Sequence, residues 1–332
     1  ILVFLPKSRF NAQLPERVAA IVGEAYGSPT RDLGSLIGSG NLARIKFSLD
    51  RGESLPDLDD LSDVVDGYTT AWLDRVAEAA THEFGESRGA TLLQRIGPAA
   101  PDGYRTSVDP QTAVGDFARL EKLLTEQGDT LTALTRTIDA PDGVWRMRVY
   151  RRGAPVALSD LLPLLSHLGL QALDEHPYRF VLDGIQCFVY DVGVRLPGGV
   201  QLGDLRHGEV RRALEGLLAG TIEPDGFNRL ILLAGLTASQ VNVVRCYAKY
   251  AHQTGFAFSQ RYVEDSLARL PNLARLIVDL FEARFNPDTD NGERSVVVEA
   301  TRSAVRAALD DVPSLDDDRI GRTFLALVQA TV

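Results

Sequence analysis

The chain has 332 residues, of which 45% are hydrophobic and 24% charged, which excludes a disordered chain and allows two or three domains with ordinary cores. Its formal net charge of −10 argues against a nucleic-acid-binding surface, and no apolar run approaches the roughly 20 residues that a membrane span needs. Cys187 and Cys246 stand far apart in apolar contexts without metal-ligand spacing, so we expect buried thiols in a reducing compartment, the cytoplasm.

The first 50 residues predict a strand, a helix and two more strands. Ile1–Leu5 is apolar, and Leu14–Ala25 then has helical spacing up to a Gly-Ser-Pro break. Thr30–Ile37 and Ala43–Leu49 follow, and in the second of these apolar and polar residues alternate as in a strand with one buried face. The first residue is Ile1 rather than Met, which we interpret as the start of a piece of a longer protein.

From Pro56 to Gly97 the apolar spacing becomes helical. One long helix is predicted by six apolar or aromatic residues: Leu61, Val64, Val65, Tyr68, Trp72 and Val76. A second helix covers about Ala90–Ile96. Pro-Asp-Gly sequences at 101–103, 141–143 and 224–226 predict turns, and we use them as boundary markers.

Between the first and third of these turns the pattern indicates one helix followed by an α/β unit. The helix covers about Pro110–Glu126. Four strands are predicted at Thr130–Ile138, Val144–Tyr150, Leu170–Leu182 and Ile185–Leu196, the first two as a hairpin. Two helices are predicted, one burying Leu161, Leu162, Leu165 and Leu168 and one using Val210, Leu214, Leu217 and Leu218. This order fits an antiparallel sheet covered on one face.

After Pro224 every segment has helical spacing. Thr237 and Gln240 form a capping box at the start of a helix that ends near Thr254, and Pro271 opens the next helix. Two further apolar stripes are predicted, one of Val297, Ala300, Ala304, Val305 and Ala308, and one of Ile320, Phe324, Leu327 and Val328 behind a Ser314/Asp317 cap.

Gly38–Ala43 matches the G-x-G-x-x-A form of the dinucleotide fingerprint, and the acidic cluster Asp57–Asp66 lies near the distance of a ribose-binding carboxylate. The fingerprint needs a helix that starts at the glycines, so that its N–H groups face the pyrophosphate. An alternating strand follows instead, which favours a hairpin turn over a nucleotide site. The five histidines have no metal-ligand spacing, so no metal site is expected.

Four short sequences carry a specific resemblance: DGFNRL (225–230), RCYAKY (245–250), GFAFSQRY (255–262) and LFEARF (280–285). They resemble the helical segment that precedes the catalytic domain of the large bacterial NAD-specific glutamate dehydrogenases, and a weaker likeness extends over most of the chain. The resemblance implies an α+β fold with two ACT-like (ferredoxin-like) antiparallel sheet units and covering helices, at 1–98 and 99–223. An all-helical region at 224–332 then leads to a catalytic domain outside this sequence.

The resemblance also implies a non-catalytic regulatory or assembly segment. The parent reaction is oxidative deamination of L-glutamate to 2-oxoglutarate and ammonia with hydride transfer to NAD, so NAD belongs to the parent enzyme, and this piece alone is expected to be inactive, with no catalytic, cofactor or metal residue. Because ACT modules elsewhere bind amino acids or pair edge to edge, two functions stay open: sensing of an amino-acid effector, or a purely structural scaffold for oligomerisation or domain positioning. The expected partners are its own catalytic domain and further copies in a homo-oligomer, with no nucleic acid and no membrane.

Three basic residues fall at i, i+4 and i+7 on one face of the predicted helix Thr237–Thr254: Arg245, Lys249 and His252. Such a stripe could hold a carboxylate, a phosphate or an acidic neighbouring domain, or be an ordinary solvated face with internal partners among Asp225, Glu264 and Asp265. Six residues are therefore candidate inter-domain or ligand contacts: Arg245, Lys249, His252, Asp225, Asn228 and Arg229.

An aromatic cluster occurs in the same stretch, made of Tyr247, Tyr250, Phe256, Phe258 and Tyr262. A ligand or partner surface and core packing both fit such a cluster. Helical spacing of aromatic residues is more typical of core packing, which is the interpretation we favour.

Overall fold

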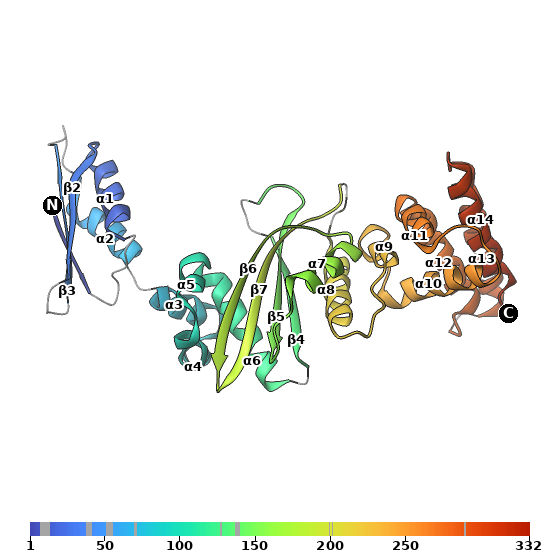
Figure 1. Ribbon diagram of the computed structural model, residues 1–332, viewed down its shortest axis with the longest axis horizontal. Coiled ribbons are helices and arrows are strands. Elements are labelled where there is room, and N and C mark those ends of the chain that lie inside the picture. The colour runs from blue at the N-terminus through green and yellow to red at the C-terminus, as the bar shows by residue number, and fades with distance from the viewer. Residues whose placement is uncertain are drawn as a thin grey trace. The chain divides into compact units, whose positions relative to one another are not determined.

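A computed structural model describes residues 1–6, 14–37, 42–50, 56–69, 72–126, 128–136, 140–198, 200, 202–288 and 290–332 (Figure 1). The chain forms two compact units, Ile1–Glu121 and Lys122–Val332. Two antiparallel sheets and a helical C-terminal region make up the α+β fold expected from the sequence. The three-part division at 98 and 223 stays a prediction.

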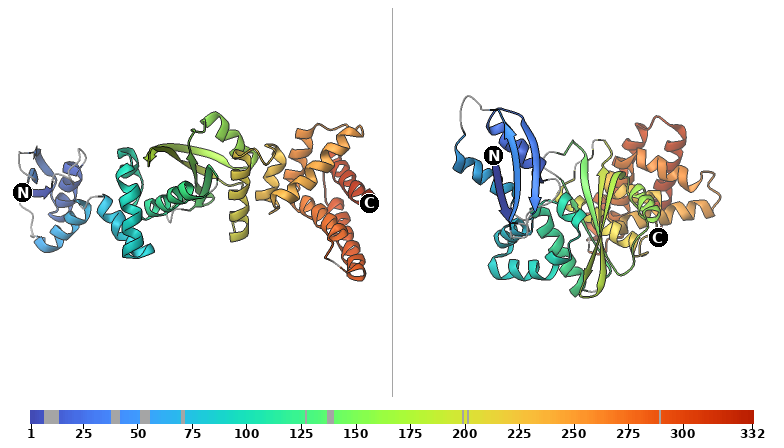
Figure 2. Two further views of the ribbon diagram at one scale, coloured as in Figure 1. Left: turned by 90° about the horizontal axis from the view of Figure 1, so that it is seen from below. Right: turned by 60° about the vertical axis from the view of Figure 1, so that its left-hand side comes forward.

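The first sheet has three strands in the order β1-β3-β2. Its elements are β1 (Leu2–Pro6), α1 (Leu14–Ala25), β2 (Thr30–Ile37), β3 (Leu42–Leu49) and α2 (Leu58–Thr69). The predicted alternation of the central strand is confirmed, because Ala43, Ile45 and Phe47 are buried on the face covered by α1 and α2 (Figure 1 and Figure 2). The glycines of the fingerprint, Gly38 and Gly40, lie outside the described residues, and a strand starts directly after them at Leu42.

The opposite face of this sheet carries exposed apolar side chains on all three strands: Leu2, Phe4, Leu36 and Leu42. Arg44 and Lys46 lie between them, because they are the register partners of Phe4 and Leu2 across the β1–β3 pair. The face therefore combines exposed apolar side chains, mostly on the edge strands, with two cations on the central strand. Large exposed apolar side chains that lie close together are typical of an interaction face.

The rest of the first unit is helical. It contains α3 (Trp72–Phe84), α4 (Glu86–Ile96), the 3₁₀ turn η2 (Gly97–Ala99), α5 (Asp102–Ser107) and the start of α6 (Pro110–Thr125). Residues 70 and 71, in the middle of the predicted long helix, lie outside the described residues. The first Pro-Asp-Gly sequence is not a turn: Pro101 is the N-cap of α5, because proline suits a helix start and Asp102 then favours the helix dipole.

The second sheet has the strand order β4-β5-β7-β6 and contains the predicted hairpin. Its strands are β4 (Thr130–Thr135), β5 (Val144–Arg152), β6 (Gln171–Leu182) and β7 (Ile185–Arg195), and its helices are α7 (Leu158–His167) and α8 (Asp204–Leu218). The middle Pro-Asp-Gly sequence is a true turn, closed by a 3.0 Å hydrogen bond from the Val144 N–H to the Pro141 carbonyl, with Gly143 at a φ of 75°.

Both faces of this sheet bury apolar side chains, so the expectation of one covered face was wrong. Met147 and Val192 pack with α7 and α8, whereas Tyr150, Phe180 and Val189 are fully buried on the opposite face. The strands carry apolar side chains in both registers, which is the pattern of a sheet buried on both sides.

The C-terminal helices share one hydrophobic core with the face of the second sheet that packs against α7 and α8. They are η3 (Gly226–Asn228), α9 (Arg229–Leu233), α10 (Ala238–Gln253), α11 (Gln260–Arg269), α12 (Pro271–Phe285), α13 (Asn291–Asp310) and α14 (Leu315–Ala330). That core is continuous from the strands to the last helix and includes Met147, Leu165, Leu214, Phe227, Ile277 and Phe324. The Thr237/Gln240 capping box and the Ser314 cap are confirmed.

Three local expectations of burial were wrong. Along α13 the predicted stripe has the wrong phase, because Val297 and Ala304 are exposed and the buried residues are Val305 and Leu309. Alanine has a small side chain that is tolerated on both faces of a helix, so alanine spacing is a weak indicator of which face is buried. Cys246 is exposed, whereas Cys187 is buried as expected, and burial raises the pKa of its thiol.

In the part of the chain that the structure describes, no helix combines the length and apolar content that crossing a membrane requires.

The third wrong expectation is the burial of Leu162, and this residue provides a matched control for a test of the core. Leu161 is fully buried and Leu162 is 38% exposed on the same helix, α7. Leu161→Ala should lower the free energy of unfolding by about 2–5 kcal/mol, because it leaves a cavity in the shared core. Leu162→Ala makes the same helix substitution near the surface and should cost about 1 kcal/mol or less. Urea melts of both variants would show equal losses if Leu161 did not belong to the core.

Candidate functional site

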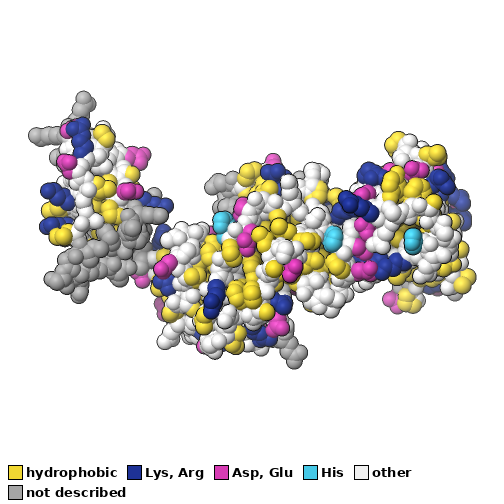
Figure 3. Space-filling model, in the orientation of Figure 1, with side chains coloured by type: hydrophobic (Ala, Val, Ile, Leu, Met, Phe, Trp, Pro, Cys, Tyr) yellow, Lys and Arg dark blue, Asp and Glu magenta, His cyan; other side chains and the backbone are white. Residues whose placement is uncertain are grey.

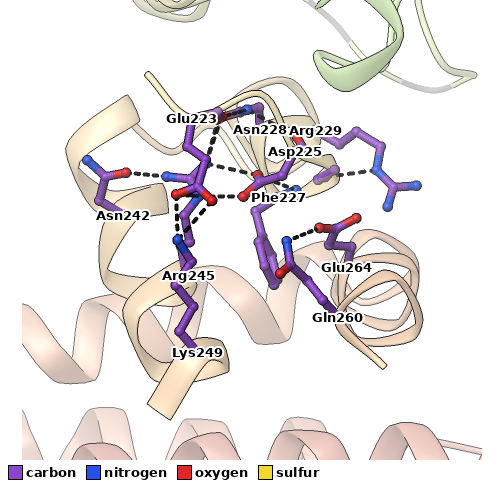
Figure 4. Close-up of polar contacts among 11 residues, drawn as sticks. Glu223, Asp225, Phe227, Asn228, Arg229, Asn242, Arg245, Lys249, Gln260 and Glu264 are labelled. Carbon is purple, nitrogen blue, oxygen red and sulfur yellow. Dashed lines mark hydrogen bonds and ion pairs between the residues drawn. The ribbon is translucent and has the colours of Figure 1, made fainter. Parts of the chain in front are cut away.

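The candidate site is built around the junction segment, which we define as residues 223–229, where the chain passes from α8 into the C-terminal helices (Figure 4). Asp225 is the N-cap of η3 and accepts a 3.1 Å hydrogen bond from the Phe227 N–H. The Asn228 side chain closes the loop by donating to the carbonyls of Glu223, at 2.8 Å, and Asp225, at 3.0 Å. Phe227 is fully buried in the shared core and fixes the segment there.

The third Pro-Asp-Gly sequence therefore opens a helix rather than forming a free turn. Asp225, Gly226, Phe227 and Asn228 are all buried. An aspartate followed by a short helical turn is a common N-cap, and the side-chain hydrogen bond explains why this residue type stands there.

Arg245 of α10 binds the junction segment from inside the protein and is only 3% exposed. Its Nε donates to Asp225 Oδ2 at 2.5 Å, and its Nη2 donates to Asp225 Oδ1 at 2.9 Å, so the ion pair is bidentate (Figure 4). Nη2 also donates to Asn228 Oδ1 at 3.0 Å, and Nη1 donates to the side chain of Asn242. The planar guanidinium suits this fork-shaped contact, which a lysine could not make.

The other two residues of the basic stripe lie in different surroundings. The Lys249 ammonium donates to both carboxylate oxygens of Glu223, at 2.8 Å and 2.6 Å, at the protein surface. The His252 side chain is exposed and has no hydrogen bond or ion pair within the described part of the chain. The three residues thus do not form one solvated surface, since the first is internal, the second is paired at the rim and the third faces solvent.

Arg229 lies on the opposite side of the junction segment from Arg245. Its Nε donates to the Gly226 carbonyl at 2.9 Å and its Nη2 to Asp265 Oδ1 of α11 at 2.7 Å. Asp265 therefore pairs with Arg229 and not with the stripe, and the stripe's partner from the sequence analysis is Asp225 alone.

An open pocket of about 480 Å³ lies beside Arg229, between the end of α7 and the start of α11. It is lined by Ser166, His167, Gly226, Arg229, Gln260, Arg261, Glu264 and Asp265. Figure 3 shows basic, acidic and histidine side chains gathered on the surface near α9, between the second sheet and the C-terminal helices. Most of these lining residues were missed in the sequence, because the pocket is built from three segments that lie some 30 to 100 residues apart. The i, i+4 pair Gln260/Glu264 is the one local signal among the lining residues.

Gly226 lies close to α11 where the junction segment lines the pocket. A Cβ built on Gly226 would lie 2.5 Å from Glu264 Oε2 and 3.0 Å from Arg229 Nη2. The glycine therefore lets the Glu264 carboxylate lie directly against the backbone of the junction segment.

The aromatic cluster divides in the same way as the stripe. Phe256 and Phe258 have ring centroids 5.1 Å apart, and both pack against the shared core, as Tyr247 does, which confirms core packing for these three. Tyr262 stacks on Phe258 at 5.2 Å, whereas Tyr250 is exposed. Among the described residues, no group of three or more His, Cys, Asp or Glu side chains could hold a metal ion.

The Arg245–Asp225 pair gives a sharp stability prediction. Arg245→Met should lower the free energy of unfolding by about 3–5 kcal/mol, because it leaves a buried carboxylate without its cation. Lys249→Met, which removes a surface pair on the same helix, should cost about 0–1 kcal/mol. Denaturant melts measure both, and equal losses would contradict the internal role of Arg245.

The Glu223–Lys249 pair leads to a prediction about the pKa of the Glu223 carboxyl. The pKa of the Glu223 carboxyl is lowered, chiefly by the hydrogen bonds from Lys249. Partial burial acts in the opposite direction, and the positive charges of Lys249 and Arg245 lower the pKa further. Its contribution to stability is thus present above the unfolded pKa of about 4.3 and is lost as the pH falls through the lower folded value. Lys249→Met should raise the pKa of Glu223 in an NMR titration, while Arg212→Met, which removes the cation of the separate Glu209 pair, should leave it unchanged.

Comparison with known proteins assigns the chain to a family. Models of glutamate dehydrogenase segments match it in succession: the ACT2 domain at residues 1–73, helical motif 2 at 79–123, the ACT3 domain at 129–207 and helical motif 3 at 222–287. The ACT3 match ends at residue 207, inside α8, and the helical motif 3 match begins at residue 222, after α8, so the junction segment belongs to helical motif 3.

Three similar proteins are described as NAD-specific glutamate dehydrogenases. They come from Halomonas elongata (32% identical), Mycobacterium tuberculosis (30%) and Pseudomonas aeruginosa (27%), and each similarity covers 100% of this chain and 21% of the relative. The chain thus spans about a fifth of the length of these relatives. With four consecutive segment matches over most of its length, the chain belongs to the glutamate dehydrogenase family, in the region of the ACT2, helical motif 2, ACT3 and helical motif 3 segments.

Proposed function

We propose that the chain is a non-catalytic regulatory and assembly segment of an NAD-dependent glutamate dehydrogenase. The whole enzyme would convert L-glutamate, NAD and water to 2-oxoglutarate, ammonia and NADH, as the names of the relatives suggest. NAD and the chemistry belong to another part of that enzyme in this proposal, so the chain alone has no activity and does not bind NAD. The enzyme works in the cytoplasm, in keeping with the free thiols of Cys187 and Cys246.

Assembly is supported by one observation, the exposed face of the first sheet. Phe4 is 59% and Leu36 is 55% exposed, although both are large apolar residues in regular strands. Leaving such side chains in water forfeits about 25 cal/mol for each Å² of apolar surface that a partner would cover. Arg44 and Lys46 on the same face have no ion-pair partner among the described residues.

A second copy of the chain is the occupant that charge favours. The chain carries a net charge of −10, so its surface is richer in carboxylates that could meet Arg44 and Lys46 than in cations that would repel them. Homo-oligomers are also the commonest assemblies of soluble enzymes. Contact with the enzyme's own catalytic domain is the second candidate, and it would use the same apolar surface.

Regulation is the finer part of the proposal. The second ACT unit and the C-terminal helices share one core, and the junction segment is clamped to α10 by Arg245. A ligand that binds one arrangement of these elements better than another would shift the population toward that arrangement. A scaffold without any ligand is the alternative, and it predicts assembly without an effector.

Sedimentation of the purified chain tests the assembly surface. We expect the chain to self-associate, and the double change Phe4→Asp with Leu36→Asp should shift it to monomer, because buried carboxylates oppose an apolar contact. Both positions are exposed, so folding should change little. Val64→Asp on α2, another exposed apolar position, is the matched control and should leave self-association unchanged. A monomeric wild type, or an unaltered double variant, would contradict assembly of copies through this face.

A further inference from the structure

The pocket between α7 and α11 has a lining of balanced charge. Two guanidinium groups, of Arg229 and Arg261, face it together with two carboxylates, of Glu264 and Asp265. Its volume of about 480 Å³ lies within the roughly 300–1,000 Å³ typical of small-molecule sites. In this pocket a simple anion would be repelled by the two carboxylates, and a simple cation would be repelled by the two guanidinium groups. A zwitterion, which carries charges of both signs, can pair with both kinds of group.

Two of these four charges have no opposite charge of their own. Glu264 is only 9% exposed. Its carboxylate accepts a 2.8 Å hydrogen bond from the neutral amide of Gln260, and no cation of the described residues lies within ion-pair distance of it. The Arg261 guanidinium is exposed and has no ion pair or hydrogen bond among the described residues. The other two, Arg229 and Asp265, pair with each other.

A buried carboxylate without a cation is costly, so Glu264 is the strongest sign of a missing partner. His167 adds a second sign at the other wall, because its Nδ1 is buried and has no hydrogen-bond partner in the described part of the protein. One polar ligand placed between α7 and α11 could give the Glu264 carboxylate a cation and His167 Nδ1 a hydrogen-bond partner.

We propose that this pocket binds a free α-amino acid with a polar side chain, its ammonium on Glu264 and its carboxylate on Arg261. Arg261 and Glu264 stand three residues apart on α11, so they lie on one helix face with their Cβ atoms about 5–6 Å apart. That spacing suits the two charged groups of an α-amino acid, which are attached to the same carbon. The polar side chain then lies toward Ser166 and His167 at the end of α7.

This inference rests on the proposed function and names the effector class and its site. The ligand would contact α7 of the second ACT unit, Gly226 of the junction segment and α11 of the helical region at once. Its binding energy would therefore favour the arrangement in which these three elements close on it, which is the differential affinity that regulation requires.

Calorimetric titration of the full chain with the free L-amino acids, preceded by a thermal-shift screen, tests the proposal. We expect a polar amino acid to raise the melting temperature, and its N-acetyl derivative, its amide and inorganic phosphate to have no effect. Arg261→Ala should raise Kd at least tenfold, because it removes the cation for the carboxylate. Arg306→Ala on α13 also removes an exposed arginine without a partner among the described residues and should leave Kd unchanged.

Glu264→Gln should abolish binding while keeping an oxygen that can accept from Gln260, and Arg261→Ala covers the case in which this buried change prevents folding. No binding by any amino acid, or binding that is insensitive to Arg261→Ala, would overturn the site. Binding of phosphate or of the N-acetyl derivative alone would also overturn it, in favour of an anion site. Each of these results leaves the sedimentation test of the first sheet unaffected, so failure of the site and failure of the assembly proposal are separate outcomes.

Discussion

The arrangement of the second unit depends on the buried pair of Arg245 and Asp225. Both groups are almost completely removed from water, and desolvation of two charges costs several kcal/mol for each ion unless the geometry is very good. Here the guanidinium meets both carboxylate oxygens, and its remaining donors reach Asn228 and Asn242. The pair is therefore satisfied, and it holds the junction segment against α10.

The junction segment makes a different contact on each of its two sides. On one side Asp225 and Asn228 bind Arg245; on the other, Gly226 and Arg229 form the floor of the pocket at α11. Four neighbouring residues of the DGFNRL sequence thus serve two contacts, and Phe227 between them is fixed in the core. A change in the position of α10 cannot leave the pocket floor unaltered, since interiors packed this densely transmit displacement.

Sequence patterns predicted the parts of this fold that local physics decides. The alternation in β3, the hairpin closed at Gly143 and the capping box at Thr237 follow from spacing and turn chemistry, and all three occur. The prediction failed where tertiary neighbours decide. Helical spacing placed Arg245 correctly on a face of α10, but only the position of Asp225 some 20 residues earlier shows that this face is inside.

The same limit explains why the sequence did not predict the pocket and why two of the three turn predictions, at 101–103 and 224–226, were wrong. Ser166, Gly226 and Arg261 belong to three elements that come together only after the core has formed, so no window of sequence contains the pocket. Pro-Asp-Gly is compatible with a β-turn and with a helix start alike, and the hydrogen bond from the Phe227 N–H decides the matter at Asp225.

Replacing a buried ion pair with apolar residues of similar size is often neutral or even stabilising, so stability alone does not explain why charges stand at 225 and 245. A pair of apolar side chains would pack in many rotations of the junction segment, whereas a bidentate contact allows one. That single orientation points Gly226 at Glu264 and carries Arg229 to Asp265. The structural role of the buried pair is therefore to set the geometry of the pocket on the far side of the segment.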